Sequence, residues 1–233
     1  MKYLFAAVVA VAAVLGGACA PARHSFEDEG AFDPVEPINR AVYGFNKKID
    51  AAALRPAAKI YSGFPPLFRT AVENVLSNLG EPKNMVNHAL QGRADDTAGS
   101  MARFVFNSTF GIGGMADVAQ SMGVPREEND FGRTIRSYTG NGGAYIMLPF
   151  WGPSSLADAP GAAADIAVAP QTYAEKSVRA GTGAAKATIA RAELLEDEYL
   201  LEGALDEYSI VRDVREELRR QNVPALVWDI ADR

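Results

Sequence analysis

The chain contains one cysteine, two histidines and, beyond Ala20, no long hydrophobic run. Because Cys19 is alone, no intramolecular disulfide can form, and no cysteine is left to join His24 and His88 in a metal cluster. The sequence has no G-x-S-x-G nucleophile elbow and no Walker motif, and nothing around His88 supports a Ser-His-Asp triad. We therefore expect no catalytic residue, no metal and no cofactor, in a protein that is not an enzyme.

One short motif resembles a cofactor site. Gly111-Ile112-Gly113-Gly114-Met115-Ala116 matches the dinucleotide fingerprint G-x-G-x-x-A. That fingerprint needs a strand before it, a helix after it and a surrounding β-α-β unit. The residues before it have a helical pattern, so we interpret the glycines as a hinge between two helices.

The first residues have the layout of an export signal. Lys2 precedes the apolar run Tyr3–Leu15, and small residues follow. The run is shorter than the ~20 apolar residues of a membrane-spanning helix. Cys19 stands where bacterial lipoproteins carry their acylated cysteine, although Ala18-Cys19-Ala20 also fits ordinary secretion with cleavage after Ala20. We favour lipidation, because a lone thiol in an oxidising compartment otherwise has no role. The expected boundaries are a signal peptide over 1–18 and a lipidated N-terminus and tether over 19–32.

The net charge is -6. An acidic chain does not favour nucleic acid, or attachment to anionic lipid through a basic patch. Membrane attachment must then come from apolar surface or from an acyl anchor.

The residues after Phe32 have mostly helical periodicity. Asp33-Pro34-Val35-Glu36 predicts a helix start in which Asp33 caps free N–H groups and Glu36 completes a capping box. Apolar residues then recur on one helix face, at Ile38, Val42, Phe45 and Ile49. Further helices are predicted over 65–79 and 82–91, from Asp95 onward, over 189–199 and over 210–218, with Gly181 and Gly183 as weak points. We expect one helical domain, 33–222, followed by a C-terminal tail, 223–233.

Two apolar segments allow two interpretations. Phe104–Met115 and Ala144–Trp151 are interrupted by glycine or proline and contain aromatic residues. They could be core, or they could lie at the level of lipid headgroups. Gly140-Asn141-Gly142-Gly143 could close a hairpin between two short extended pieces.

A series of ordered motifs carries a family resemblance. They include Asp33-Pro34-Val35-Glu36, Asn39–Asn46, Asp130–Thr134, Leu148–Ser154 and Asp206-Glu207-Tyr208. The most distinctive block is Arg103-Phe104 and Asn107-Ser108-Thr109, followed by Gly111–Gly114 and Asp117-Val118-Ala119. Over about Phe32 to Arg220 the chain resembles the MlaA/VacJ family of outer-membrane phospholipid-transport lipoproteins. It departs from the family pattern at Val35, where an aromatic is frequent, and at Glu207, where proline is frequent.

The resemblance implies an all-α fold, in which a ring of amphipathic helices lies in the periplasm-facing leaflet of the bacterial outer membrane. A central passage would remove mislocalised phospholipids from the outer leaflet and so maintain lipid asymmetry. The implied partners are phospholipid, a trimeric outer-membrane porin and a soluble periplasmic lipid carrier. The alternative is a non-transporting structural or porin-binding envelope lipoprotein, and an exported lipid hydrolase is a third possibility.

The resemblance also indicates candidate site residues. Broken helices can line a wet path through lipid, and glycines absorb the backbone changes of a gate. The candidates for the passage or its gate are Asn39, Arg40, Phe45, Asn46, Arg103, Asn107, Gly111, Gly113, Gly114 and Asp117. The loop candidates are Asp130, Phe131, Gly132, Gly143, Tyr145 and Pro149. Asn39 and Arg103 could equally serve as hydrogen-bonding links between helices.

Overall fold

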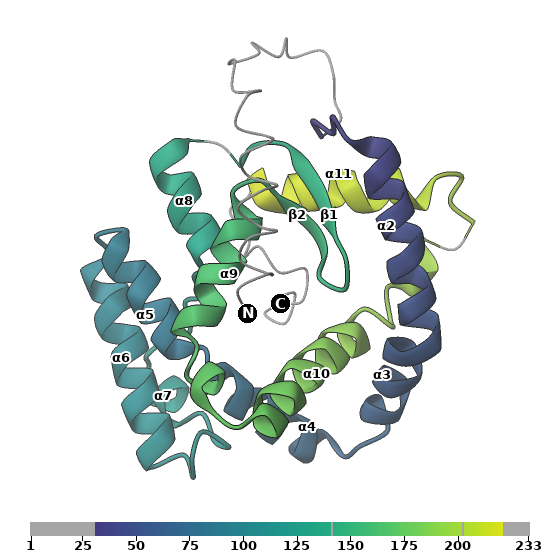
Figure 1. The fold of residues 1–233 in the computed structure, drawn as a ribbon. Coiled ribbons are helices and arrows are strands. Elements are labelled where there is room, and N and C mark those ends of the chain that lie inside the picture. The colour runs from purple at the N-terminus through teal and green to yellow at the C-terminus, as the bar shows by residue number, and fades with distance from the viewer. Residues whose placement is uncertain (1–30, 141, 202, 221–233) are drawn as a thin grey trace. The chain divides into compact units, whose positions relative to one another are not determined.

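The computed structural model describes residues 31–140, 142–201 and 203–220. The predicted signal peptide 1–18, the acylation candidate Cys19, most of the tether 19–32 and the tail 223–233 lie outside the described residues. Within them the fold is helical, as expected, with one two-stranded sheet (Figure 1). The helices are α2 (Glu36–Ile49), α3 (Arg55–Ser62), α4 (Pro66–Asn78), α5 (Glu81–Leu90), α6 (Ala94–Thr109), α7 (Val118–Ser121), α8 (Phe131–Thr139), α9 (Asp158–Val168), α10 (Lys176–Glu193) and α11 (Glu207–Arg220).

Three shorter helical segments join these elements. A π-helical segment, Asp50–Leu54, connects α2 to α3, and single 3-10 turns lie at Pro170–Tyr173 and Glu198–Leu200. Among the described residues, none of the helices combines the length and the apolarity that crossing a bilayer requires.

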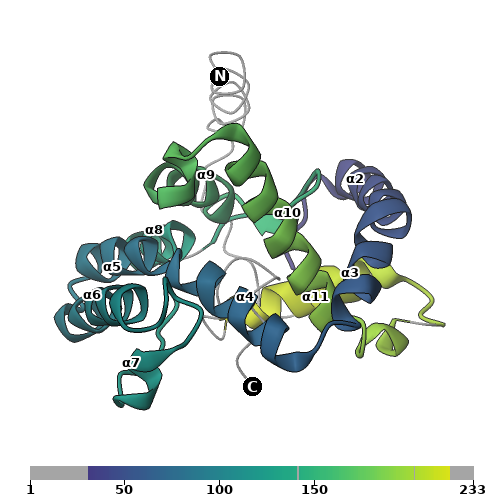
Figure 2. The same cartoon turned by 90° about the horizontal axis from the view of Figure 1, so that it is seen from below.

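The elements contact one another in a closed circuit (Figures 1 and 2). The helix α3 packs against α10, α10 against α4, and α4 against α6. The circuit continues from α6 to α5, from α5 to α8 and α9, and from α9 to strand β2. Strand β1 pairs with β2 and packs against α2, which leads back to α3. The predicted ring-like arrangement of helices is therefore confirmed.

The helices bury polar residues and expose apolar ones. In α2, Ile38 is 64% exposed whereas its neighbour Asn39 is 2% exposed. In α6, Met101 is 59% exposed whereas Arg103 is 1% exposed. The helix of a water-soluble domain has the opposite pattern, with its apolar stripe facing the core. The apolar faces predicted from the sequence exist, but much of their surface points outward.

The hairpin supplies the main apolar cluster. Tyr145 and Met147 of β1 pack with Tyr208 of α11, and Val42, Tyr43 and Val211 surround them. The Tyr145 and Tyr208 rings meet edge to face, with centroids 6.3 Å apart. This cluster therefore joins β1, α2 and α11, which are distant in the sequence.

The predicted cap of the first helix is wrong. The helix α2 begins at Glu36, and no side chain caps its first N–H groups. Asp33 instead accepts hydrogen bonds from Asn39 and Tyr208, and Glu36 pairs with Arg40. The two carboxylates that were predicted to bind free N–H groups of the helix, those of Asp33 and Glu36, therefore bind other side chains instead.

The hairpin is present but lies later in the chain than predicted. Strand β1 (Tyr145–Leu148) pairs antiparallel with β2 (Gly152–Ser155), with Leu148 opposite Gly152. The turn needs left-handed backbone at Phe150 (φ 67°) and Gly152 (φ 80°). Gly140, also left-handed, ends α8 by donating its N–H to the Arg136 carbonyl at 2.8 Å. Gly140, the first residue of the segment predicted to close the hairpin, therefore ends α8 and is not part of the hairpin turn.

The helix α10 also differs from the prediction. It runs unbroken through Gly181 and Gly183, which have open space around them, so neither is a weak point. It ends at Glu193, and Tyr199 lies in a separate 3-10 turn, so the helix predicted over 189–199 is too long. Arg191, near this end, pairs with Asp50 and Glu198.

Candidate functional site

Two asparagines of α2 hold the hairpin. Asn39 and Asn46 are two helical turns apart and so lie on one face. The Asn39 amide donates to the Tyr145 carbonyl at 3.3 Å and accepts from the Met147 N–H at 2.8 Å. The Asn46 amide donates to the Leu148 carbonyl at 3.0 Å and accepts from the Phe150 N–H at 2.9 Å. Each side chain thereby satisfies backbone groups of the hairpin as a neighbouring strand would.

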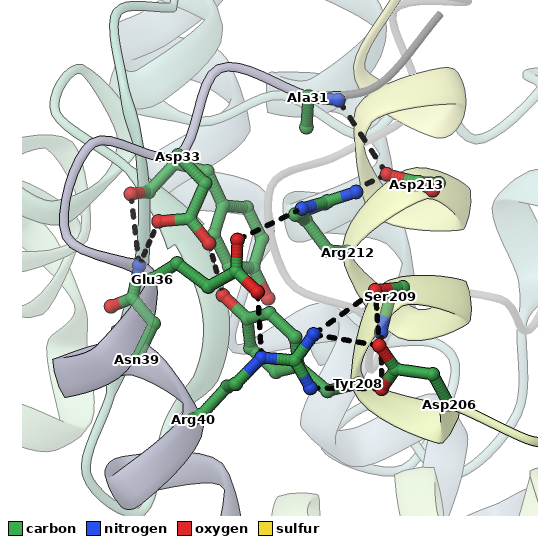
Figure 3. A network of polar contacts seen from close by, with 11 residues as sticks. Ala31, Asp33, Glu36, Asn39, Arg40, Asp206, Tyr208, Ser209, Arg212 and Asp213 are labelled. Carbon is green, nitrogen blue, oxygen red and sulfur yellow. Dashed lines mark hydrogen bonds and ion pairs between the residues drawn. The ribbon is translucent and has the colours of Figure 1, made fainter.

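The same region ties α2 to α11 through Asp33 (Figure 3). The Asp33 carboxylate accepts from the Asn39 amide at 2.7 Å and from the Tyr208 hydroxyl. Burial, followed by the hydrogen bond to Asp33, raises the pKa of Tyr208 above its ordinary value. Tyr208 therefore stays a neutral donor and holds the start of the described chain against α11.

Arg40 forms a second link between α2 and α11 (Figure 3). Its guanidinium donates to both carboxylate oxygens of Asp206, at 2.9 and 2.6 Å, and to Glu36 at 2.7 Å. It also lies 4.5 Å from the centroid of the Tyr208 ring. The hydrogen bond from Arg40 holds the pKa of Asp206 well below its ordinary value. The pair is partly solvent-exposed, so it fixes the direction of α11 more than it adds to stability.

Arg103 of α6 lies at the centre of a second, buried polar cluster. Its Nε donates to Glu81 at 2.8 Å, its Nη2 to Asp117 at 2.6 Å and its Nη1 to the Val124 carbonyl at 2.8 Å. Although burial opposes charge on both groups, these hydrogen bonds raise the pKa of Arg103 and lower the pKa of Asp117. Arg103 and Asp117 therefore both stay charged, and the cluster holds α5, α6 and the start of α7 together.

The Gly111–Gly114 segment is a compact connection between α6 and α7. A Cβ on Gly111 would lie 2.2 Å from the Ala116 carbonyl oxygen and 2.5 Å from that of Asn107. Gly114 has φ 96°, and its N–H donates to the Asn107 carbonyl at 2.9 Å. The Asn107 side chain bonds Asp117 and the Ala119 N–H, so this residue organises the connection.

Apolar side chains project from the same connection. Ile112 is 77% exposed, and Phe110 and Met115 are also exposed. Since α6 and not a strand precedes the glycines, the dinucleotide reading fails and the predicted hinge between helices is correct in position. Gly113 alone among these glycines has open space beside its Cα and a left-handed φ of 68°.

The loop candidates begin at the start of α8. Asp130 caps that helix by accepting from the Arg133 N–H at 2.7 Å, and the Phe131 N–H donates to Asp165 at 3.2 Å. A Cβ on Gly132 would lie 2.6 Å from an Asp158 oxygen, so α8 and α9 cross closely here. Burial raises the pKa of Asp165 to about 6.

The remaining loop candidates flank the hairpin. Gly143 has a left-handed φ of 72° just before β1, Tyr145 is buried and Pro149 is exposed in the turn. Phe45 packs edge to face on Phe150, with ring centroids 5.2 Å apart.

The structure therefore divides the predicted residues into three groups. Asn39, Phe45, Asn46, Gly143, Tyr145 and Pro149 lie around the hairpin, and Arg40, on the same helix as the two asparagines, instead contacts Asp206 and Tyr208. Arg103, Asn107, Gly111, Gly113, Gly114 and Asp117 lie around the connection after α6. Asp130, Phe131 and Gly132 lie at the start of α8. The helices α2 and α6, which carry the first two groups, lie on opposite sides of the ring (Figures 1 and 2).

A buried polar face on α5 was not predicted. His88 is fully buried. Its Nε2 lies 3.0 Å from the Glu127 carbonyl oxygen, and its Nδ1 lies 2.9 Å from the Asn129 amide nitrogen. Gln91 bonds Asn129 and Thr134, both at 2.9 Å. The signal was present in the sequence, because Asn84, Asn87, His88 and Gln91 have the three-and-four spacing of one helix face. Within the described residues no cluster of acidic, histidine or cysteine side chains could hold a metal ion.

Comparison with known proteins identifies similar sequences. A family model described as MlaA lipoprotein matches residues 31–222. The intermembrane phospholipid transport system lipoprotein MlaA of Escherichia coli (strain K12) is 33% identical over 193 residues, which cover 80% of this chain and 76% of that protein. An uncharacterized protein of Rickettsia felis is 38% identical over 128 residues, which cover 54% of this chain and about half, 51%, of that relative's length.

A solved structure has a similar fold. It was described in work on the structural basis for maintenance of bacterial outer membrane lipid asymmetry, and it superimposes with a TM-score of 0.71 at 34% sequence identity. The match covers 81% of this chain and 96% of the solved chain. The similarity therefore extends over nearly the whole helical ring.

Proposed function

Because this chain belongs to the MlaA lipoprotein family, we propose that it removes mislocalised phospholipid from the outer leaflet of the bacterial outer membrane. The lipid passes through the ring toward the periplasm, and lipid asymmetry is thereby maintained. The names of the relatives and of the solved structure support this proposal.

The observation that carries the proposal is the inverted burial of the helices. Exposed apolar side chains follow one another along α3, α4, α6 and the connection to α7: Ile60, Phe64, Leu67, Phe68, Met101, Val105, Phe110, Ile112 and Met115. In lipid such side chains are in a favourable solvent, and buried polar groups must be bonded internally. The internal bonds of Asn39, Asn107 and Arg103 meet that requirement.

We place the ring in the periplasm-facing leaflet, with the acyl chains of Cys19 as an additional anchor. A ring without a membrane-spanning helix among its described residues suits one leaflet rather than both. The passage or its gate involves Asn46, Gly111, Gly113 and Gly143. The partners are a trimeric porin, which positions the ring near the outer leaflet, and a soluble periplasmic carrier, which takes the lipid away.

The proposal needs no bond-making chemistry, because the lipid moves as an intact molecule. His88 is fully buried and bonded to Asn129, which supports transport rather than hydrolysis.

The test is carried out in a strain that lacks the chain. Aminophospholipid in the outer leaflet of intact cells is labelled with an amine reagent that does not cross membranes. The full chain should lower this labelling, and Ile112→Asp should fail to do so, because an anionic side chain is costly in lipid. Gln120→Glu, which also adds a carboxylate at an exposed position nearby, is the matched control and should behave as the unaltered chain does.

The runner-up function is that of a non-transporting, porin-binding envelope lipoprotein. If labelling stays the same whether the full chain is present or absent, while the chain still copurifies with porin, transport is refuted and this alternative replaces it.

A further inference from the structure

A cavity of about 460 Å³ lies where the C-terminal ends of α5, α8 and α11 meet. Its charged lining consists of Arg93, Arg133, Arg136, Arg219, Arg220 and Glu216. Amide and hydroxyl side chains of the same elements complete the polar lining. The candidate site residues discussed above do not include any of these five arginines.

The cavity has more positive than negative charge. Glu216 is shared, since it pairs with Arg219 and also lies 3.6 Å from Arg220. Arg136 pairs with Asp158, which also pairs with Arg215 at 3.2 Å. Arg133 donates to the Glu128 carbonyl and has no carboxylate partner within 4 Å among the described residues. Arg93 pairs with Asp96 at 2.7 Å. The lining therefore carries five guanidinium groups and one carboxylate, and Arg133 is the one of these arginines without a carboxylate partner among the described residues.

Hydrogen-bond donors are also in surplus. The Nε of Arg133 and the Nη2 of Arg136 are buried and have no acceptor in the part of the chain that the structure describes. An orphaned donor of this kind is costly, because it has left water without gaining a partner. Burial lowers the pKa of Arg136 to about 10, and the nearby guanidinium groups act in the same direction.

Helix termini explain only part of this arrangement. The C-terminal end of a helix attracts cations, with a partial charge of about half an electron that acts within the last turn. Three such ends would favour some of the arginines, but they do not supply acceptors to the buried Arg133 Nε and Arg136 Nη2.

We propose that this cavity binds the phosphoryl group of a phospholipid headgroup and favours headgroups that carry no ammonium. The inference rests on the proposed function, which brings phospholipid into the ring. Guanidinium groups match phosphoryl oxygens through paired hydrogen bonds, and the volume is within the range of small-ligand sites, roughly 300–1,000 Å³. An ammonium would meet a lining of five arginines whose one acidic side chain, Glu216, is already paired with Arg219. Phosphatidylglycerol should therefore bind more tightly than zwitterionic lipid, whose phosphoryl group is bound more weakly but is not excluded.

The binding test uses the full chain in an uncharged detergent. It is titrated calorimetrically with three probes: dihexanoyl phosphatidylglycerol, dihexanoyl phosphatidylcholine and inorganic phosphate. We expect the phosphatidylglycerol probe to bind at least roughly tenfold more tightly than the phosphatidylcholine probe, since charge-assisted hydrogen bonds dominate the difference. Equal or tighter binding of inorganic phosphate would reassign the site to a soluble phosphate, and no binding of any probe would overturn the proposal.

Two variants and a control locate the binding. Arg133→Gln and Arg219→Gln should each weaken the phosphatidylglycerol probe roughly tenfold. Arg179→Gln removes the same charge from an exposed position on α10, outside the cavity lining, and should leave affinity unchanged. Circular dichroism identifies a variant that has not folded. If Arg133→Gln does not fold, the test rests on Arg219→Gln alone. An equal loss of affinity with Arg179→Gln would mean unspecific attraction and refute the site.

The labelling experiment in cells separates this inference from the proposed function. If the full chain fails to restore asymmetry, the function is wrong whatever the calorimetry shows. If asymmetry is restored and no phosphoryl probe binds, the function stands and the cavity proposal alone is wrong.

Discussion

The guanidinium of Arg103 and the carboxylate of Asp117 lie 2.6 Å apart and join the middle of α6 to the start of α7. The same guanidinium reaches Glu81, whose side chain is 1% exposed, whereas that of Asp117 is 26% exposed. Arg103 is therefore the shared partner of one deeply buried carboxylate and one that water can still reach.

This asymmetry predicts unequal effects of removing each partner. Arg103→Met leaves Glu81 buried without its cation and should lower the free energy of unfolding by about 3–5 kcal/mol. Asp117→Asn should cost less, because Arg103 keeps Glu81. Urea unfolding in uncharged detergent, followed by circular dichroism, measures both. Arg126→Met, at a partly exposed and longer pair with Glu128 (3.6 Å), is the control and should change stability less. Equal losses for Arg103→Met and Arg126→Met would contradict the buried-pair interpretation.

Asp165 predicts a dependence of stability on pH. Burial raises the pKa of this carboxyl from 3.8 to about 6 in the folded chain. Between about pH 4 and pH 6 the folded state therefore keeps a proton that the unfolded state has released. The contribution of Asp165 to stability falls as pH rises through this window, by up to about 3 kcal/mol, and is constant above it.

The matching variant is Asp165→Asn. Its amide oxygen can still accept from the Phe131 N–H and from Asn87, so the fold should persist with a weaker dependence on pH. Melting temperatures measured from about pH 4 to pH 8 test this, with the exposed Glu175→Gln as control. A decline of equal steepness in Asp165→Asn and in the unaltered chain would rule out Asp165 as its source.

The asparagine contacts with the hairpin predict a separation of stability from transport. Asn39→Ala removes the partners of the buried Tyr145 carbonyl and Met147 N–H and should cost about 1–3 kcal/mol of stability. Asn46→Ala removes the partners of the Leu148 carbonyl and the Phe150 N–H, which are more exposed, and should cost less stability. Lipid removal in cells, normalised to the amount of folded chain, then shows whether either asparagine also shapes the passage. Normalised transport that stays constant would assign both residues to structure alone.

The connection after α6 predicts a gate that can be locked. The Asn74 amide donates to the Met115 carbonyl at 3.0 Å, so α4 is the fixed element beside this loop. A short reducible cross-linker between cysteines at Asn74→Cys and Met115→Cys should slow lipid removal, and reduction should restore it, because the glycines can no longer change conformation. Each single-cysteine variant, treated in the same way, is the control. Full transport in the cross-linked chain would show that this segment does not open.

Short-range patterns in the sequence were sufficient for part of the fold. The period of apolar residues located α4, α5 and α6, since their starts and ends depend on prolines and glycines close in the chain. The predicted cap at Asp33 and the predicted hairpin position were wrong because the deciding partners are far away in the sequence. Tyr208 binds the Asp33 carboxylate, and the Asn39 side chain binds the backbone of the hairpin. Most candidate residues make specific contacts in the fold, but the sequence could not show that they form three separate groups.

The sequence by itself determined the helical class, the family motifs and the existence of an apolar face on each amphipathic helix. Only the tertiary structure decided which way those faces point, and it turned Ile38, Leu67 and Met101 outward while burying Asn39, Arg103 and Asn107. The physical reason is that apolar periodicity marks a surface that avoids water, and a protein core and a lipid layer satisfy that requirement equally well. The arginine cavity has the same origin, because Arg133 and Arg219 meet only when α8 and α11 converge.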